Sequence, residues 1–163
     1  MTEMLTLLII YQIKHFLADY PMQTQYMLGK FKDKDWVVPL AAHSAVHAWF
    51  TLLIVWIYTS DLMLAMGLSG LDFAVHFSMD RVKASSKLLG RFKAISPETY
   101  GKLSDIIAVF EWNRDYDNRD QVQGVLDRAM KSNKYFWWSL GFDQTVHHIT
   151  HYVIIFIMYG RIV

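Results

Sequence analysis

Residues 36–58 read WVVPLAAHSAVHAWFTLLIVWIY, and this apolar run is the segment that decides the fold class. At 1.5 Å per residue, a helix of this length crosses a hydrocarbon core of about 30 Å. Trp36, Trp56 and Tyr58 stand near its ends, where aromatic rings favour the headgroup region. His43 and His47 are spaced i, i+4 and share one helical face. The segment predicts a membrane-spanning helix that presents two imidazoles to one side.

Three further apolar runs flank this segment, at about residues 4–17, 62–79 and 137–159. Together the four runs predict an all-α fold, a four-helix transmembrane bundle in a single integral membrane domain over residues 1–163. Hydrophobic residues make up 53% of the chain, which is unusual for a soluble domain of this size. A soluble helical bundle with a very apolar core is the alternative interpretation.

The charged loops predict how the bundle is oriented. Basic residues gather after the first run, at Lys30, Lys32 and Lys34, and again after the third, from Arg81 to Lys93. The connection at residues 59–61 has no basic residue. The positive-inside rule therefore predicts a multi-pass protein of the inner membrane, with both basic loops in the cytoplasm and both termini outside.

Residues of about 81–134 are too polar to cross a bilayer and predict a cytoplasmic helical insertion between the third and fourth helices. Ser96-Pro97-Glu98 is typical of a helix start, and Asn118 is a candidate cap for a second helix. Both helices would be amphipathic. An ordinary solvated insertion is an equally good interpretation.

The composition narrows the chemistry and the partners. The chain has no cysteine, so thiol nucleophiles, disulfides and cysteine-ligated metals are excluded. Its formal net charge of +1 gives no reason to expect nucleic acid as a partner. Membrane lipid and a metal ion are the expected partners, and the sequence is compatible with a homo-oligomer.

Each predicted helix carries one pair of ionisable residues at i, i+4 spacing. The pairs are His15 and Asp19, His43 and His47, His76 and Asp80, and Asp143 and His147. In the first and third helices the pair stands at the end, and in the second and fourth it stands near the beginning. Because neighbouring helices run in opposite directions in the predicted topology, all four pairs reach a similar depth.

Ionisable groups at that depth cost several kcal/mol unless they find partners inside the bundle. No pair contains a lysine, so the pattern indicates a bound divalent cation, with Zn, Mn or Fe as candidates, and two ions fit eight ligands. Asp72 and His151 are interpreted as outer groups. An isolated pair is equally well explained as a hydrogen bond between helices.

The leading functional hypothesis is a metal-dependent hydrolase that acts on a lipid-linked or phosphorylated substrate at the cytoplasmic face. Asp19, Asp80 and Asp143 are the candidates for a bridging ligand or general base. Lys14 and Arg81 are candidates for holding an anionic group, although extension of both side chains to the interface explains them equally well. The alternatives are a divalent-metal transporter or metal sensor, and a membrane di-iron oxidase.

At these residues the chain resembles an uncharacterised family of small bacterial and phage membrane proteins, domain of unknown function 3307. The matching segments are residues 15–23 (HFLADYPMQ), the helix with His43 and His47, residues 76–80 (HFSMD) and residues 142–147 (FDQTVH). The pattern is also similar to that of membrane-bound metal-dependent hydrolases. The resemblance implies a hydrolase at the membrane surface, and the insertion lies outside it.

Overall fold

A computed structural model describes residues 2–32, 34–85, 87–92 and 134–162. Its described part is all-helical and contains no strand. Four long helices carry the architecture, and two short 3-10 turns accompany them. The elements are α1 (Thr2–Asp19), η1 (Met27–Phe31), α2 (Val37–Thr59), α3 (Leu62–Ala84), η2 (Leu89–Phe92) and α6 (Lys134–Ile162).

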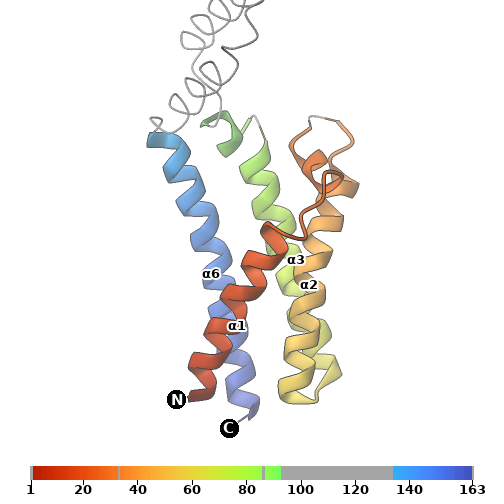
Figure 1. Ribbon diagram of the computed structural model, residues 1–163, viewed down its shortest axis with the longest axis vertical. Helices are drawn as coiled ribbons and strands as arrows, with labels where there is room; N and C mark the ends of the chain where they lie inside the picture. Colours follow the sequence, from red (N-terminus) through yellow and green to blue (C-terminus); the bar gives the residue numbers. More distant parts are fainter. Residues whose placement is uncertain (1, 33, 86, 93–133, 163) are drawn as a thin grey trace, which may run out of the picture.

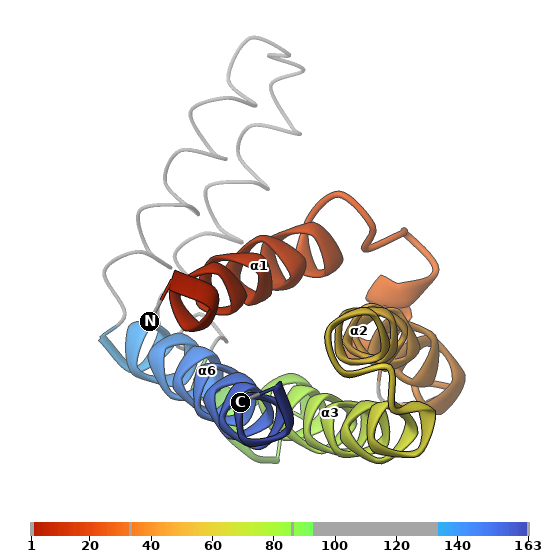
Figure 2. The same ribbon diagram turned by 90° about the horizontal axis from the view of Figure 1, so that it is seen from below.

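The four helices alternate in direction around a ring (Figures 1 and 2). Both termini and the α2–α3 connection lie at one end of the bundle, and η1 and η2 lie at the other. Seen along the bundle, α1 and α3 face each other, with α2 and α6 between them. This arrangement confirms the predicted all-helical fold and its alternating order.

Each helix extends beyond the apolar run that predicted it. The third run ends at Met79, whereas α3 continues through Asp80 and Lys83 to Ala84. The fourth run begins at Trp137, whereas α6 begins at Lys134. A search for apolar sequence stops at charged residues, but in α3 Asp80 and Lys83 face the interior, so the helix continues past them; at the ends of α6, Lys134 and Arg161 are exposed. The helices predicted after Ser96 and Asn118 lie outside the described residues.

A tight turn joins α2 to α3. Ser60 adopts the left-handed conformation with φ of 53°, and its N–H donates to the carbonyl of Trp56. The Asp61 carboxylate then accepts from the N–H of Leu64 at 2.9 Å and caps α3. With only two residues between them, the helices pack closely side by side.

An apolar layer fills the half of the bundle nearest the termini. All four long helices contribute to it, and its members are Leu7, Tyr11, Val55, Ala65, Leu68, Ile154, Ile155 and Met158. Tyr11 donates its hydroxyl hydrogen to the sulfur of Met158 inside this layer. The other half of the bundle interior is occupied by polar side chains.

The outer surface of the bundle is apolar. Large hydrophobic side chains stand exposed on every long helix, among them Phe16, Trp49, Met63 and Phe156. Two helices, α2 and α3, are long and apolar enough to cross a membrane. The distribution is the reverse of that in a water-soluble domain, where charged side chains are exposed and apolar ones are buried.

Candidate metal centre

A polar core lies between the apolar layer and the end of the bundle that carries η1 and η2. Its imidazoles and carboxylates are His15, Asp19, His43, His47, Asp72, His76, Asp80, Asp143, His147 and His151. All eight sequence-predicted ligands belong to this set, and the structure brings them together. His43, His47 and His76 have no exposed surface at all.

Alternation of helix direction produces this convergence. Asp19 stands at the end of α1 and Asp80 near the end of α3, whereas His43 and Asp143 stand near the beginnings of α2 and α6. Because α1 and α3 run opposite to α2 and α6, these positions come to the same depth (Figure 1). Within each helix, i, i+4 spacing then stacks a second polar side chain on the inward face.

The structure pairs the predicted residues differently in α3. His76 contacts Asp72, one turn earlier, with 3.1 Å between Nδ1 and Oδ1. Asp80 instead lies 3.2 Å from Nε2 of His43 in α2. In α1 and α6 the predicted local pairs form, at 3.2 Å for His15 with Asp19.

Lysines neutralise three of the carboxylates, although none of the predicted i, i+4 pairs contains a lysine. Lys14 Nζ donates to Asp72 at 2.7 Å, and Lys30 Nζ donates to Asp80 at 2.6 Å. The third pair joins Lys83 to Asp143. The charge argument for a cation therefore does not extend to all eight ligands, because most of the negative charge in the polar core is already balanced.

Asp19 is the exception. Among the described residues it has no lysine partner, and its carboxylate instead faces three imidazoles. The distances from its oxygens to Nε2 are 3.2 Å for His15, 3.4 Å for His43 and 3.1 Å for His47. The side chain is 19% exposed, more than any other carboxylate of the polar core. One negative charge thus remains without a lysine at the most accessible point of the site.

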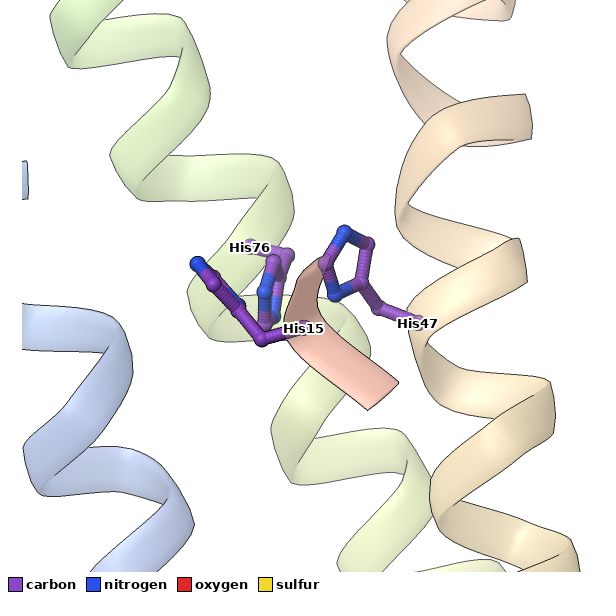
Figure 3. A group of neighbouring side chains, drawn as sticks. All are labelled: His15, His47 and His76. Atoms are coloured by element: carbon purple, nitrogen blue, oxygen red, sulfur yellow. The ribbon is translucent and has the colours of Figure 1, made fainter. Parts of the chain in front are cut away.

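The imidazole rings are crowded against one another. His47 and His76 stack with 3.8 Å between centroids, and His76 and His147 stack at 4.1 Å. Figure 3 shows the side chains of His15, His47 and His76 converging from α1, α2 and α3. Stacked rings repel when both are protonated, so the arrangement disfavours protonation of both members of a stacked pair.

Several buried ring nitrogens find no hydrogen-bond partner among the described residues. The ring nitrogens concerned are Nδ1 of His15, His43, His47, His147 and His151, and Nε2 of His43 and His76. An unpaired buried polar atom costs about 1–3 kcal/mol, so a group of them favours a bound ion or water. Imidazole lone pairs beside a carboxylate suit a divalent transition metal.

Ligand atoms come within metal-binding reach of one another in four overlapping groups. Atoms within 4.8 Å of one another are offered by His15, His47 and His76; by Asp19, His43 and His47; by Asp72, His76 and His151; and by Asp80, Asp143 and His147. The buried His and Asp side chains are therefore able to hold a metal ion. The first two groups share His47 and contain no lysine-paired carboxylate.

The two predicted anion-binding residues lie in different surroundings. Lys14 is buried inside the bundle and is committed to Asp72. The guanidinium of Arg81 lies over the ring of Trp36, 3.8 Å from its centroid, in a cation–π contact. Lys83, which pairs with Asp143 in the polar core, is more accessible than Lys14, and its side chain is 18% exposed.

Sequence reasoning did not assign Lys30, Lys83 and Thr51 to the site. Lys83 had a usable signal, since it follows His76 by seven positions and Asp80 by three, so it shares their helical face. Thr51, which donates to Asp72, had the same signal, since it follows His47 by one turn and so shares its helical face. Lys30 had none, because it enters from the turn η1, where no helical periodicity links it to Asp80.

Known proteins offer no further guide to this arrangement. Comparison of the chain with protein-family models, with curated proteins and with solved structures found no match. The resemblance drawn from the sequence motifs accordingly stays a prediction, and the function has to be argued from the site.

Proposed function

We propose that this chain is a membrane-embedded metal-dependent hydrolase whose substrate is lipid-linked or phosphorylated. All four long helices would cross the inner membrane, with η1 and η2 at the cytoplasmic face and both termini outside. The observation that carries the proposal is the ring of three imidazoles around Asp19, the most exposed carboxylate of a largely buried polar core.

The distribution of side chains supports the membrane. Lipid is a suitable solvent for exposed Phe16, Trp49 and Phe156, whereas water is not. Ionisable groups within membrane spans characteristically face the bundle interior and pair with one another, as the lysines and aspartates do here. Only α2 and α3 are apolar enough to qualify by composition alone, because the inward faces of α1 and α6 are so polar.

Asp19 and its three imidazoles support a metal site. Four ligands, one of them anionic, match the donor set of a zinc or iron site. With the other carboxylates neutralised by lysines, Asp19 supplies the negative charge that a single cation needs. One ion at Asp19 therefore fits the charge balance better than the two ions that eight free ligands would suggest.

The apolar layer that closes one end of the polar core favours catalysis over transport. The apolar layer from Leu7 to Met158 separates the polar core from the end of the bundle that carries the termini. A site that opens at one end admits substrate and water from that side and releases product to it. A transporter would need a second opening through Leu7, Val55 and Ile155.

The surrounding residues suit hydrolysis of a phosphate ester. A divalent ion, when bound, would supply Lewis-acid activation of water and of the phosphoryl oxygen. His15, Asp19, His43 and His47 would hold it. Asp80, 3.2 Å from His43, is the nearest second carboxylate and would accept the proton of the attacking water. Lys83 is better placed than buried Lys14 to meet an anionic group.

The test is hydrolysis of a lipid phosphate by the purified protein. With Zn²⁺ or Mn²⁺ we expect release of inorganic phosphate from phosphatidic acid in mixed micelles, lost on chelation and restored by the metal. Asp19→Asn should lower the rate at least about 100-fold, the scale of losing one preorganised electrostatic contact. Asp35→Asn changes an exposed carboxylate outside the polar core and serves as the matched control.

Divalent-metal transport is the second candidate, favoured by the depth of the polar core, which reaches from Asp143 near one end to Lys14 beside the apolar layer. Metal flux into proteoliposomes separates the two. Flux without phosphate release would replace the hydrolase with a transporter, and phosphate release that is equal in Asp19→Asn would remove Asp19 from the reaction.

A further inference from the structure

We propose that Asp72 is a positioning residue, which fixes the tautomer of His76 so that Nε2 is offered to a metal ion held with His15 and His47. This inference rests on the proposed metal site and adds a residue outside its ligand set. It also gives the buried lysine at position 14 a role.

Asp72 joins three helices through its carboxylate. Oδ2 accepts from Lys14 Nζ of α1 and from Thr51 Oγ1 of α2, each at 2.7 Å. The other oxygen, Oδ1, lies 3.1 Å from Nδ1 of His76 in α3. Asp72 has no exposed surface, so these contacts set its position without competition from water.

The contacts of Nδ1 determine where the His76 proton lies. Nδ1 is hydrogen-bonded to the backbone carbonyl oxygen of Asp72 at 3.0 Å, and Oδ1 of the same residue lies 3.1 Å from Nδ1 but outside hydrogen-bonding geometry. A carbonyl oxygen only accepts hydrogen bonds, and a carboxylate paired with lysine does the same. Nδ1 must therefore carry the hydrogen, which leaves the lone pair of a neutral His76 on Nε2.

That lone pair lies among the rings of His15 and His47 and meets no hydrogen-bond donor in the part of the chain that the structure describes. Nε2 of His76 is buried and has no hydrogen-bond partner among the described residues. His76 brings a ligand atom within 4.8 Å of those of His15 and His47, and Figure 3 shows the three rings together. His47 belongs both to this group and to the group that contains Asp19 and His43, so it links the two.

A carboxylate behind a ligating histidine is a known way to orient the ring and raise its basicity. Lys14 keeps Asp72 ionised and in place within the apolar surroundings. Thr51 of the neighbouring helix α2 fixes the same oxygen. The three residues together form a support for His76 that has no contact with substrate.

The tautomer is tested first, without metal. In metal-free protein labelled with ¹⁵N at histidine, we expect the His76 side chain to carry its proton on Nδ1. A proton on Nε2 would overturn the assignment, because that nitrogen could not then bind a metal.

The dependence on Asp72 is tested by Zn²⁺ binding. Asp72→Asn alone leaves Lys14 as an unpaired buried charge, so the variant is the double substitution Lys14→Met with Asp72→Asn. We expect it to bind Zn²⁺ about 10–100-fold more weakly than the parent protein. Ser69→Ala is the matched control, since Ser69 is also buried in α3 and donates to the carbonyl of Ala48 instead. A folded double variant with parental affinity would refute the positioning role.

The outcomes separate this inference from the proposed reaction. Zn²⁺ binding that depends on Asp72, in a protein that releases no phosphate, would retain the inference and reject the hydrolase. Zn²⁺ binding that is indifferent to Asp72, with phosphate release intact, would do the reverse.

Discussion

Asp80 illustrates how single residues are balanced in this interior. It lies between Lys30 at 2.6 Å and Nε2 of His43 at 3.2 Å, and its side chain is 4% exposed. Removing one partner of a buried ion pair leaves the other as an uncompensated charge. The lysines therefore control whether the carboxylates remain ionised and correctly placed.

Replacement of Lys30 should accordingly destabilise the fold. We expect Lys30→Met to lower the free energy of unfolding by about 3–5 kcal/mol, because Asp80 loses its counter-charge inside the bundle. The double substitution Lys30→Met with Asp80→Asn should recover most of that loss. Reversible unfolding in detergent micelles measures both.

Lys32→Met is the control for this pair, since Lys32 lies two positions from Lys30 and is exposed. We expect it to be close to neutral. Equal destabilisation by Lys30→Met and Lys32→Met would show that the buried pair contributes nothing specific.

At this scale the sequence predicted well which imidazoles and carboxylates come together, and it predicted their counter-charges poorly. The pairs at i, i+4 spacing identified His15, Asp19, His43 and His47, because helical periodicity is visible in sequence. The contact between Lys30 and Asp80 joins a turn to a distant helix, and no local pattern encodes it.

Among the elements, α2 and α3 form the most tightly joined pair. Their connection depends on Ser60 in the left-handed conformation and on Asp61 as the cap of α3. The cap sets where α3 begins, and through helical periodicity it sets the direction in which Asp72 and His76 point. A small defect at the turn therefore propagates to the polar core.

Loss of the cap is a measurable change. We expect Asp61→Ala to lower the free energy of unfolding by about 1 kcal/mol, because the N–H of Leu64 loses its acceptor. Asp61→Asn keeps an oxygen at the same position and should be nearly neutral. The two variants are compared by unfolding in detergent, and equal losses would indicate that the cap geometry is unimportant.

The helix ends show what apolar patterning omits. The runs located all four long helices, but α3 and α6 continue through charged residues that the runs excluded. In α3 these residues are stabilised by contacts across the bundle, such as Lys83 with Asp143, which depend on how the helices assemble.

In the whole molecule, the alternating direction of the helices determines both where the connections lie and where the ionisable pairs meet. The same alternation that brings the four pairs to one depth places both termini and the α2–α3 connection at the opposite end (Figure 1). Sequence predicted this arrangement because loop charge and pair position are independent signals that agree. The orientation in the membrane stays a prediction.

Cysteine labelling tests that orientation cleanly, since the chain has no cysteine of its own. In intact spheroplasts, a membrane-impermeant maleimide should modify Thr2→Cys but not Lys32→Cys, both of which replace exposed residues. Lysis should make the second reactive. Labelling of Lys32→Cys alone in intact spheroplasts would invert the topology, and recovery of the protein in the soluble fraction would reject the membrane.

The apolar layer has a consequence for the cell as well as for the site. In the proposed membrane placement, a chain with so many ionisable groups in half of its interior risks becoming a leak for protons. Leu7, Val55, Ile154 and Ile155 would then insulate the polar half from the side that carries the termini, because hydrocarbon offers no hydrogen-bonded relay. A cell that overproduces the protein should therefore keep its proton-motive force.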